Sequence, residues 1–146
     1  MKKSSTEKRS PKTVAKESVR WVTIGMDLGD KSSQVCGLNA AGEAVGEQSI
    51  ATTKKALLRF FANRARCRVA MEVGTHSPWV SRLLKQLGHE VFVANPRQVR
   101  LISEISRKND KVDARLLAKL ARLDPELLRP IRHRSEEAVS VKARVT

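Results

Sequence analysis

The chain has 146 residues, 40% of them hydrophobic, which is enough for one domain with a buried core and excludes a disordered basic tail. A formal net charge of +14 favours a polyanionic partner, most often nucleic acid. No apolar run approaches the roughly 20 residues needed to span a bilayer, so no membrane partner is expected. The two distant cysteines favour reduced thiols over a zinc site, and hence a cytoplasmic location.

The first 20 residues carry seven basic and two acidic side chains with almost no apolar pattern, and they predict a flexible basic arm. Short β-rich segments at 21–28, 33–38 and 44–51 then predict three strands. Because the turns between them are short, these strands should form an antiparallel meander.

Helices and strands alternate through the rest of the chain. Helical spacing predicts a helix that Thr52 or Thr53 can cap. The next helix is well delimited, with Ser77 at the N-cap, Pro78 in the first turn and Gly88 at the end. Further strands are predicted at 67–73 and 89–95, and further helices at 97–106 and 110–123.

The order β-β-β-α-β-α-β-α predicts an α/β fold with a mixed sheet, in which three antiparallel strands precede β-α crossovers and helices cover the faces. This is the order of RNase H-like domains, which occur in nucleases, integrases and Holliday-junction resolvases. We expect the ordered domain to span 21–125. Residues 126–146 read as a short helix and a polar tail, the start of a C-terminal domain that this chain lacks.

Two acids end apolar strands. Asp27 closes the most hydrophobic strand and Glu72 follows "VAM" in the segment 67–73. A carboxylate in such a strand is costly unless it is paired or binds a cation. Because these two strands are neighbours in an RNase H-like sheet, both carboxylates should emerge side by side.

A second pair of acids lies in the basic stretch "SRKNDKVDARLLAKLARL". Asp110 and Asp113 are three residues apart, and Leu117 and Leu120 continue the same helical stripe. The stripe should therefore carry both acids to the rim where Asp27 emerges. Carboxylates crowded at one point repel each other, and two Mg²⁺ ions about 3.5–4 Å apart would relieve the repulsion and act on a phosphodiester.

A simpler interpretation stays open for the same residues. Asp110 at the N-cap with Asp113 at N3 is an ordinary helix start. Asp30 is interpreted as a turn residue and His76 as part of a solvated helix start. If the acids serve only as caps, the chain is a non-catalytic nucleic-acid-binding module. Mg²⁺ binding would distinguish this module from a metal-dependent enzyme.

Basic residues are dense near the second acidic pair. The segment 97–134 holds eleven Lys and Arg against five acids, and it is either a solvated face or a track for phosphates. The candidate nucleic-acid contacts are Lys31, Arg97, Arg100, Arg107, Lys108, Lys111 and Arg115.

Four motifs, "IGMDLGDKSS", "AMEVGTHSPW", "VFVANPRQVR" and "RKNDKVDARLLAKL", resemble the N-terminal domain of the DEDD transposases of bacterial insertion sequences. That family includes a site-specific recombinase that inverts a pilin gene segment. The resemblance covers roughly 21–125, and the Asp-x-x-Asp-Ala motif is its most specific part.

The resemblance implies a RuvC-like fold and a catalytic, metal-binding tetrad of Asp27, Glu72, Asp110 and Asp113. It implies Mg²⁺ or Mn²⁺ as cofactor and DNA as partner, with a structured guide RNA and a homo-oligomer left open. Family members carry a second domain with a serine nucleophile. Because this chain stops at Thr146, we expect it not to complete recombination alone.

A third alternative comes from "IGMDLG", which is similar to the first phosphate loop of actin-like sugar kinases and chaperone ATPases. Those proteins normally place Thr or Ser after the glycine, where this chain has Asp30. They also need a second phosphate loop and an adenosine-binding domain, for which 146 residues leave no room. This alternative is therefore the weakest.

Overall fold

The computed structural model describes residues 18–106 and 113–133. In these ranges the strands form one mixed sheet with the order β3-β2-β1-β4-β5. β1, β2 and β3 are antiparallel neighbours, whereas β4 and β5 run parallel to β1. The arrangement is α/β, and it is compatible with an RNase H-like fold. The strands are β1 (Thr23–Asp27), β2 (Ser32–Leu38), β3 (Ala44–Ala51), β4 (Arg68–Glu72) and β5 (Glu90–Ala94).

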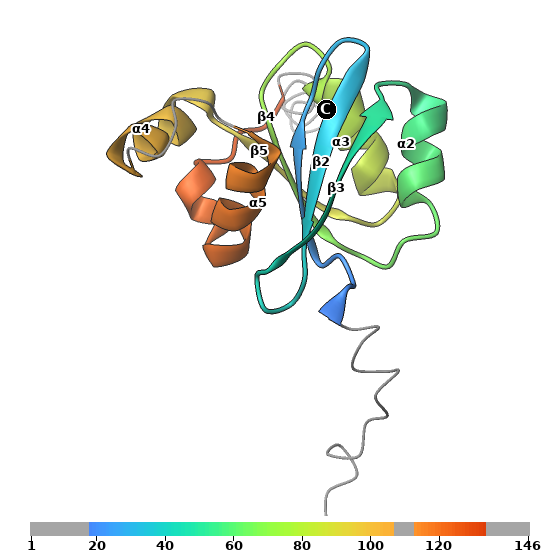
Figure 1. Cartoon of the computed structure of the whole chain (residues 1–146). Coiled ribbons are helices and arrows are strands. Elements are labelled where there is room, and N and C mark those ends of the chain that lie inside the picture. The colour runs from blue at the N-terminus through green and yellow to red at the C-terminus, as the bar shows by residue number, and fades with distance from the viewer. Residues whose placement is uncertain (1–17, 107–112, 134–146) are drawn as a thin grey trace, which may run out of the picture.

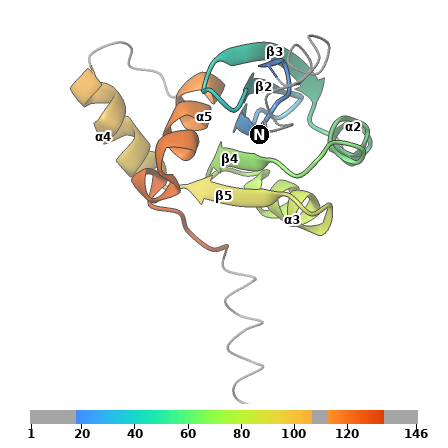
Figure 2. The same cartoon turned by 90° about the horizontal axis from the view of Figure 1, so that it is seen from below.

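Helices cover both faces of this sheet, as Figures 1 and 2 show. α2 and α3 lie on one face, and α5 packs on the other against β1, β2 and β4. α4 lies beyond α5 on the same side. The helices are α2 (Lys54–Phe61), α3 (Ser77–Gln86), α4 (Pro96–Ser106), α5 (Ala114–Leu123) and the short 3₁₀-helix η2 (Pro125–Leu128).

The strands divide their side chains between the two faces by alternation. Ile24 and Met26 of β1 join Val69 and Met71 of β4 in the core under α2 and α3. Ala70 of β4 belongs to the core under α5. The two faces are therefore filled from alternate positions of the same strands.

The backbone of α5 lies directly against the sheet at Gly25. A Cβ at this position would overlap the carbonyl oxygen of Ala114 and the backbone nitrogen of Ala118. The helix also presents small side chains to the sheet, with Ala114, Ala118 and Ala121 all buried. Because Gly25 has no side chain, the first turn of α5 can lie directly against β1.

Several element boundaries differ from the sequence predictions. The N-cap of α3 is His76 and not Ser77, which is already helical. The last helix begins at Ala114 and not at Asp110, because Asp113 has extended backbone angles and serves as the N-cap. The predicted cap at Thr53 is confirmed, since its side chain accepts a hydrogen bond from the backbone N–H of Ala56 at 3.1 Å.

The first strand begins at Thr23, two residues later than predicted. Trp21 instead lays its indole ring over Gly37 and Gly46, where a Cβ would overlap the ring. Phe60 meets the same ring edge-on, and the Arg64 guanidinium lies 5.0 Å from its centroid. In the described ranges, no helix combines the length and apolar character needed to cross a bilayer.

Candidate active site

Asp27 and Glu72 are the last residues of two adjacent parallel strands. Their neighbours Met26 and Met71 are register partners, which brings the two acids to the same edge of the sheet. Alternation directs both toward the face covered by α5, because Gly25 and Ala70, two residues earlier in each strand, contact that helix side. Sequence analysis predicted this pairing, and the register confirms that the two strand ends meet.

Both acids line one cavity of about 260 Å³. The Oε2 atom of Glu72 is buried and has no hydrogen-bond partner among the described residues. Burial raises the pKa of the Glu72 carboxyl, the nearby Arg100 guanidinium opposes that rise, and the charge of Asp27 adds to it. Glu72 therefore carries an incompletely satisfied carboxylate next to a second acid, a combination that a proton or a cation would stabilise.

Asp113 lies on the other side of Asp27. It caps α5, and its Oδ1 accepts a hydrogen bond from the backbone N–H of Leu116 at 2.9 Å. Asp113 and Asp27 line a second cavity of about 340 Å³, together with Glu47 and Arg115. Asp27 is thus shared by two cavities, one containing Glu72 and the other Asp113.

The predicted tetrad is only partly visible. Asp110 lies outside the described residues, as do the candidate contacts Arg107, Lys108 and Lys111. Within 18–106 and 113–133, no three His, Cys, Asp or Glu side chains converge closely enough to hold a metal ion. The structure brings Asp27 near Glu72 and near Asp113, but it does not gather these three around one point.

The described basic candidates surround these acids in different ways. Arg115 donates to Glu47 Oε2 at 2.6 Å, so its guanidinium is already engaged in an exposed ion pair. Arg100 is exposed and near enough to affect the Glu72 carboxyl. Lys31 and Arg97 are exposed as well.

A hydrogen-bonded chain beside the first cavity went unrecognised in the sequence. Trp79 Nε1 donates to His76 Nδ1 at 3.0 Å. An indole N–H can only donate, so Nδ1 accepts and the ring proton lies on Nε2, which donates to Asp30 Oδ1 at 3.1 Å. The i, i+3 spacing of His76 and Trp79 on a predicted helix could have indicated their contact. Nothing in the local pattern indicates that Asp30 reaches them.

Comparison with known proteins adds the family. A family model described as a transposase, of the DEDD type found in IS110 elements, matches residues 24–145. The chain belongs to the IS110 family of DEDD transposases. The IS110-family match begins inside β1 and spans the positions of all four predicted acids, which are Asp27, Glu72, Asp110 and Asp113.

A curated relative supports the IS110-family assignment. The chain is 33% identical over 91 residues to the transposase for insertion sequence element IS1328 of Yersinia enterocolitica. The aligned region covers 62% of this chain and 26% of that transposase. This IS110-family chain therefore aligns with about a quarter of the relative's length.

Proposed function

We propose that this chain is the metal-dependent catalytic domain of an insertion-sequence transposase, acting on DNA phosphodiesters with a RuvC-like fold. The observation that carries the proposal is the buried, unpartnered oxygen of Glu72 beside Asp27, at the ends of two adjacent parallel strands. Family membership and the order of the mixed sheet support it. Membership in a transposase family also argues against the actin-like ATPase alternative.

The donor set fits a hard divalent cation. Mg²⁺ prefers carboxylate oxygens and is commonly held by one or two carboxylates with water completing its shell. Asp27 and Glu72 would supply these ligands, with Asp113 and Asp110 as the further members of the proposed tetrad. When bound, such cations activate an attacking oxygen and stabilise a leaving oxygen at phosphorus.

The protein's own groups have distinct roles in this proposal. Asp27 connects the two cavities, and Glu72 supplies the buried oxygen. Asp113 is oriented by its capping bond to the backbone of α5, which uses one of its two carboxylate oxygens. Arg100 lies near Glu72, where its guanidinium can hold a phosphate that approaches the acids.

The basic surface does not distinguish DNA from RNA, because the phosphodiester backbone is common to both. A structured guide RNA therefore enters the proposal as a second nucleic-acid partner, to be tested by binding alongside duplex DNA. A homo-oligomer is a further element of the proposal, and sedimentation of the chain with and without nucleic acid tests it.

A thermal melt tests the metal site directly. Mg²⁺ or Mn²⁺ that binds only the folded state should raise Tm by an amount that grows with RT ln(1 + [L]/Kd). Burial is the main cause of the raised pKa of Glu72, and Asp27→Asn removes the neighbouring charge that adds to it, so this change should raise the metal-free Tm and reduce the metal-dependent increment. Ionic strength is held constant, so that screening of the +14 charge does not contribute.

Asp124→Asn is the matched control, because Asp124 is an exposed N-cap beyond the far end of α5. It should leave the metal-dependent increment unchanged. The proposal is wrong if millimolar Mg²⁺ and Mn²⁺ both leave the wild-type Tm unchanged and Asp27→Asn lowers the metal-free Tm.

One observation favours the non-catalytic alternative. Asp113 makes the capping bond that an ordinary helix start requires, which explains its presence without any metal. A nucleic-acid-binding module of this kind would bind DNA equally well with Mg²⁺ or with a chelator at matched ionic strength. Its Tm would also be insensitive to Mn²⁺.

A further inference from the structure

Three arginines line a cavity at the end of the sheet opposite the acids. The cavity has a volume of about 550 Å³ and lies where β4 and β5 begin and α5 ends. Arg66, Arg68 and Arg122 line it, with Glu90 as the acidic member. We call it the arginine pocket. None of these arginines belongs to the set of contacts predicted from the sequence.

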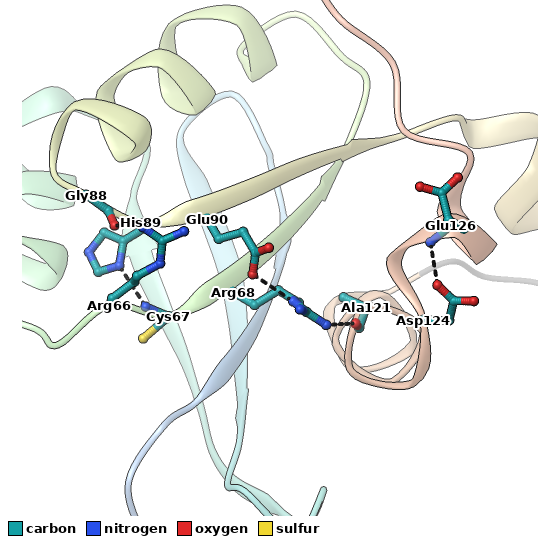
Figure 3. Close-up of polar contacts among 9 residues, drawn as sticks. All are labelled: Arg66, Cys67, Arg68, Gly88, His89, Glu90, Ala121, Asp124 and Glu126. Carbon is teal, nitrogen blue, oxygen red and sulfur yellow. Dashed lines mark hydrogen bonds and ion pairs between the residues drawn. The ribbon is translucent and has the colours of Figure 1, made fainter.

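Arg68 has a structural role in the arginine pocket. Its Nε donates to Glu90 Oε1 at 2.9 Å and its Nη1 donates to the carbonyl oxygen of Ala121 at 3.0 Å. Figure 3 shows the guanidinium between these two partners, linking the start of β5 to the last turn of α5. Because Arg68 and Glu90 neutralise each other, the charge of the pocket comes from the other two arginines.

Arg66 and Arg122 are exposed, and within 18–106 and 113–133 their guanidiniums hydrogen-bond only to backbone carbonyls. Arg66 Nη1 donates to Gly88 O and Arg122 Nη2 donates to Ala40 O, both at the long distance of 3.3 Å. In the described part of the chain, no carboxylate forms an ion pair with either. Each guanidinium has five N–H donors, so most of its capacity remains for a ligand.

The backbone of the turn between β2 and β3 contacts the Arg122 side chain. Gly42 has a φ of +87°, and a Cβ there would overlap the Arg122 guanidinium. The buried ring of His89 fixes the neighbouring segment, because its Nδ1 accepts from the Cys67 N–H at 3.1 Å. The Arg66 and Arg122 guanidiniums therefore lie on segments that different contacts hold in place.

We infer that the arginine pocket binds the phosphodiester backbone of a nucleic acid. Guanidinium groups bind phosphate oxygens through paired, charge-assisted hydrogen bonds, and two of them facing one cavity suit successive phosphates. The inference rests on the proposed function for the identity of the ligand. It adds a second contact region, because these residues lie at the opposite end of α5 from Asp113.

The distance between the two regions suits one bound strand. α5 has 10 residues, which corresponds to about 15 Å of helix between its N-cap Asp113 and the arginine pocket. At about 3.4 Å per nucleotide along one strand of duplex DNA, this distance corresponds to roughly four nucleotides. A strand whose scissile phosphate lies at the acids would have to extend past α5 by about this number of nucleotides to reach Arg122.

The test compares two double variants that remove equal charge. Arg66→Gln with Arg122→Gln alters the pocket and keeps Arg68. Lys55→Gln with Arg59→Gln alters exposed residues of α2 on the other face of the sheet and serves as the control. Binding of duplex DNA, single-stranded DNA and structured RNA is measured by anisotropy over a salt series, with EDTA present so that no metal contributes.

We expect the pocket variant to lose the salt dependence of about two phosphate contacts. For duplex DNA, each lost contact reduces the slope of log Kobs against log[salt] by about 0.9. The control should change the slope by much less for the same ligand. A reduction with DNA or with RNA supports the inference and identifies which nucleic acid reaches the pocket.

The inference is wrong if the two double variants change every slope equally. It is also wrong if inorganic phosphate is the only ligand that distinguishes the two double variants. In that case phosphate would raise the Tm of the wild type and of the control but not of the pocket variant, and the pocket would bind a free anion. The metal-dependent Tm increment of the pocket variant should stay at the wild-type value. If the wild type shows no metal-dependent rise in Tm, the catalytic proposal is wrong, but the inference about the arginine pocket is not affected.

Discussion

The backbone of Gly25 lies directly against the carbonyl oxygen of Ala114, with no space for a Cβ between them. Gly25 is two residues before Asp27 on the same face of β1, and Ala114 is the residue after Asp113. The contact between Gly25 and Ala114 therefore fixes the separation of Asp27 and Asp113, two of the proposed catalytic acids.

Gly25→Ala should destabilise the protein by about 1–3 kcal/mol, because α5 must move away from the sheet to admit the methyl group. It should also reduce the metal-dependent rise in Tm, since Asp113 moves with the helix. Gly74→Ala is the control, because the nearest atom to a Cβ there is 4.0 Å away. Equal loss of stability in both variants, by urea denaturation, would contradict this prediction.

Glu72→Gln should change how stability depends on pH. The pKa of Glu72 is raised above the ordinary value of 4.5, mainly by burial, so the folded state binds the proton more tightly than the unfolded chain. Stability of the metal-free wild type should therefore fall as pH rises from about 4.5 through the raised pKa. The Gln variant lacks this titration, so its Tm advantage should grow between pH 4 and pH 7. A constant difference across that range would exclude the predicted linkage.

Asp113→Asn and Asp124→Asn form a matched pair, because both residues are N-caps whose side chains accept from backbone N–H groups at 2.9 and 3.0 Å. Asparagine caps as well as aspartate, so Asp113→Asn should cost only about 0.3–1 kcal/mol from the lost interaction with the helix dipole. Asp124 is also the C-cap of α5, where a negative charge is unfavourable, so Asp124→Asn should cost less. Only Asp113→Asn should reduce the Tm increment caused by Mn²⁺. If both variants keep the full increment, Asp113 is a cap and not a ligand.

Glu47→Gln should strengthen nucleic-acid binding. The Arg115–Glu47 pair is exposed and screened by solvent, so its loss should change the free energy of unfolding little. The freed guanidinium can then contact a phosphate, which should steepen the salt slope for duplex DNA by about 0.9. Arg115→Gln should not steepen that slope. Identical salt series for the two variants would show that Arg115 does not contact the ligand.

Both thiols should resist alkylation in the folded protein. Burial raises the pKa of Cys36, with Glu47 adding to the rise and Arg115 opposing it. Burial likewise raises the pKa of Cys67. Because the thiolate is the reactive form, iodoacetamide at pH 7–8 should modify neither until urea unfolds the chain. Rapid labelling of the native protein, followed by mass spectrometry, would contradict the buried positions.

Local pattern was enough to predict most of the secondary structure. The third strand occupies the predicted residues, 44–51, because it is bounded by turn residues on one side and a helix cap on the other. Asp27 and Glu72 were predicted as neighbours from the adjacency of their strands in an RNase H-like sheet, and the register of β1 and β4 shows that these strands are neighbours. The residues that predict the third strand lie within or next to it. The pairing of Asp27 with Glu72 follows from one assumption about the topology of the sheet.

The remaining features depend on contacts between distant segments. The spacing of Asp110 and Asp113 suits a helix that starts at either residue, and the leucine stripe is the same in both cases, so the sequence could not decide that Asp113 is the cap. The bond between Asp30 and His76 joins residues 46 positions apart. The arginine pocket likewise draws its side chains from segments that no short motif connects.

The alternation along β1 has a consequence for how its length can vary. Inserting or deleting one residue of β1 ahead of Gly25 would turn Gly25 and Asp27 to the opposite face together, because side chains in a strand have a period of two. Asp27 would then enter the apolar core under α2 and α3, and a bulky side chain would meet the first turn of α5. Length variation should therefore be excluded from the five residues of β1.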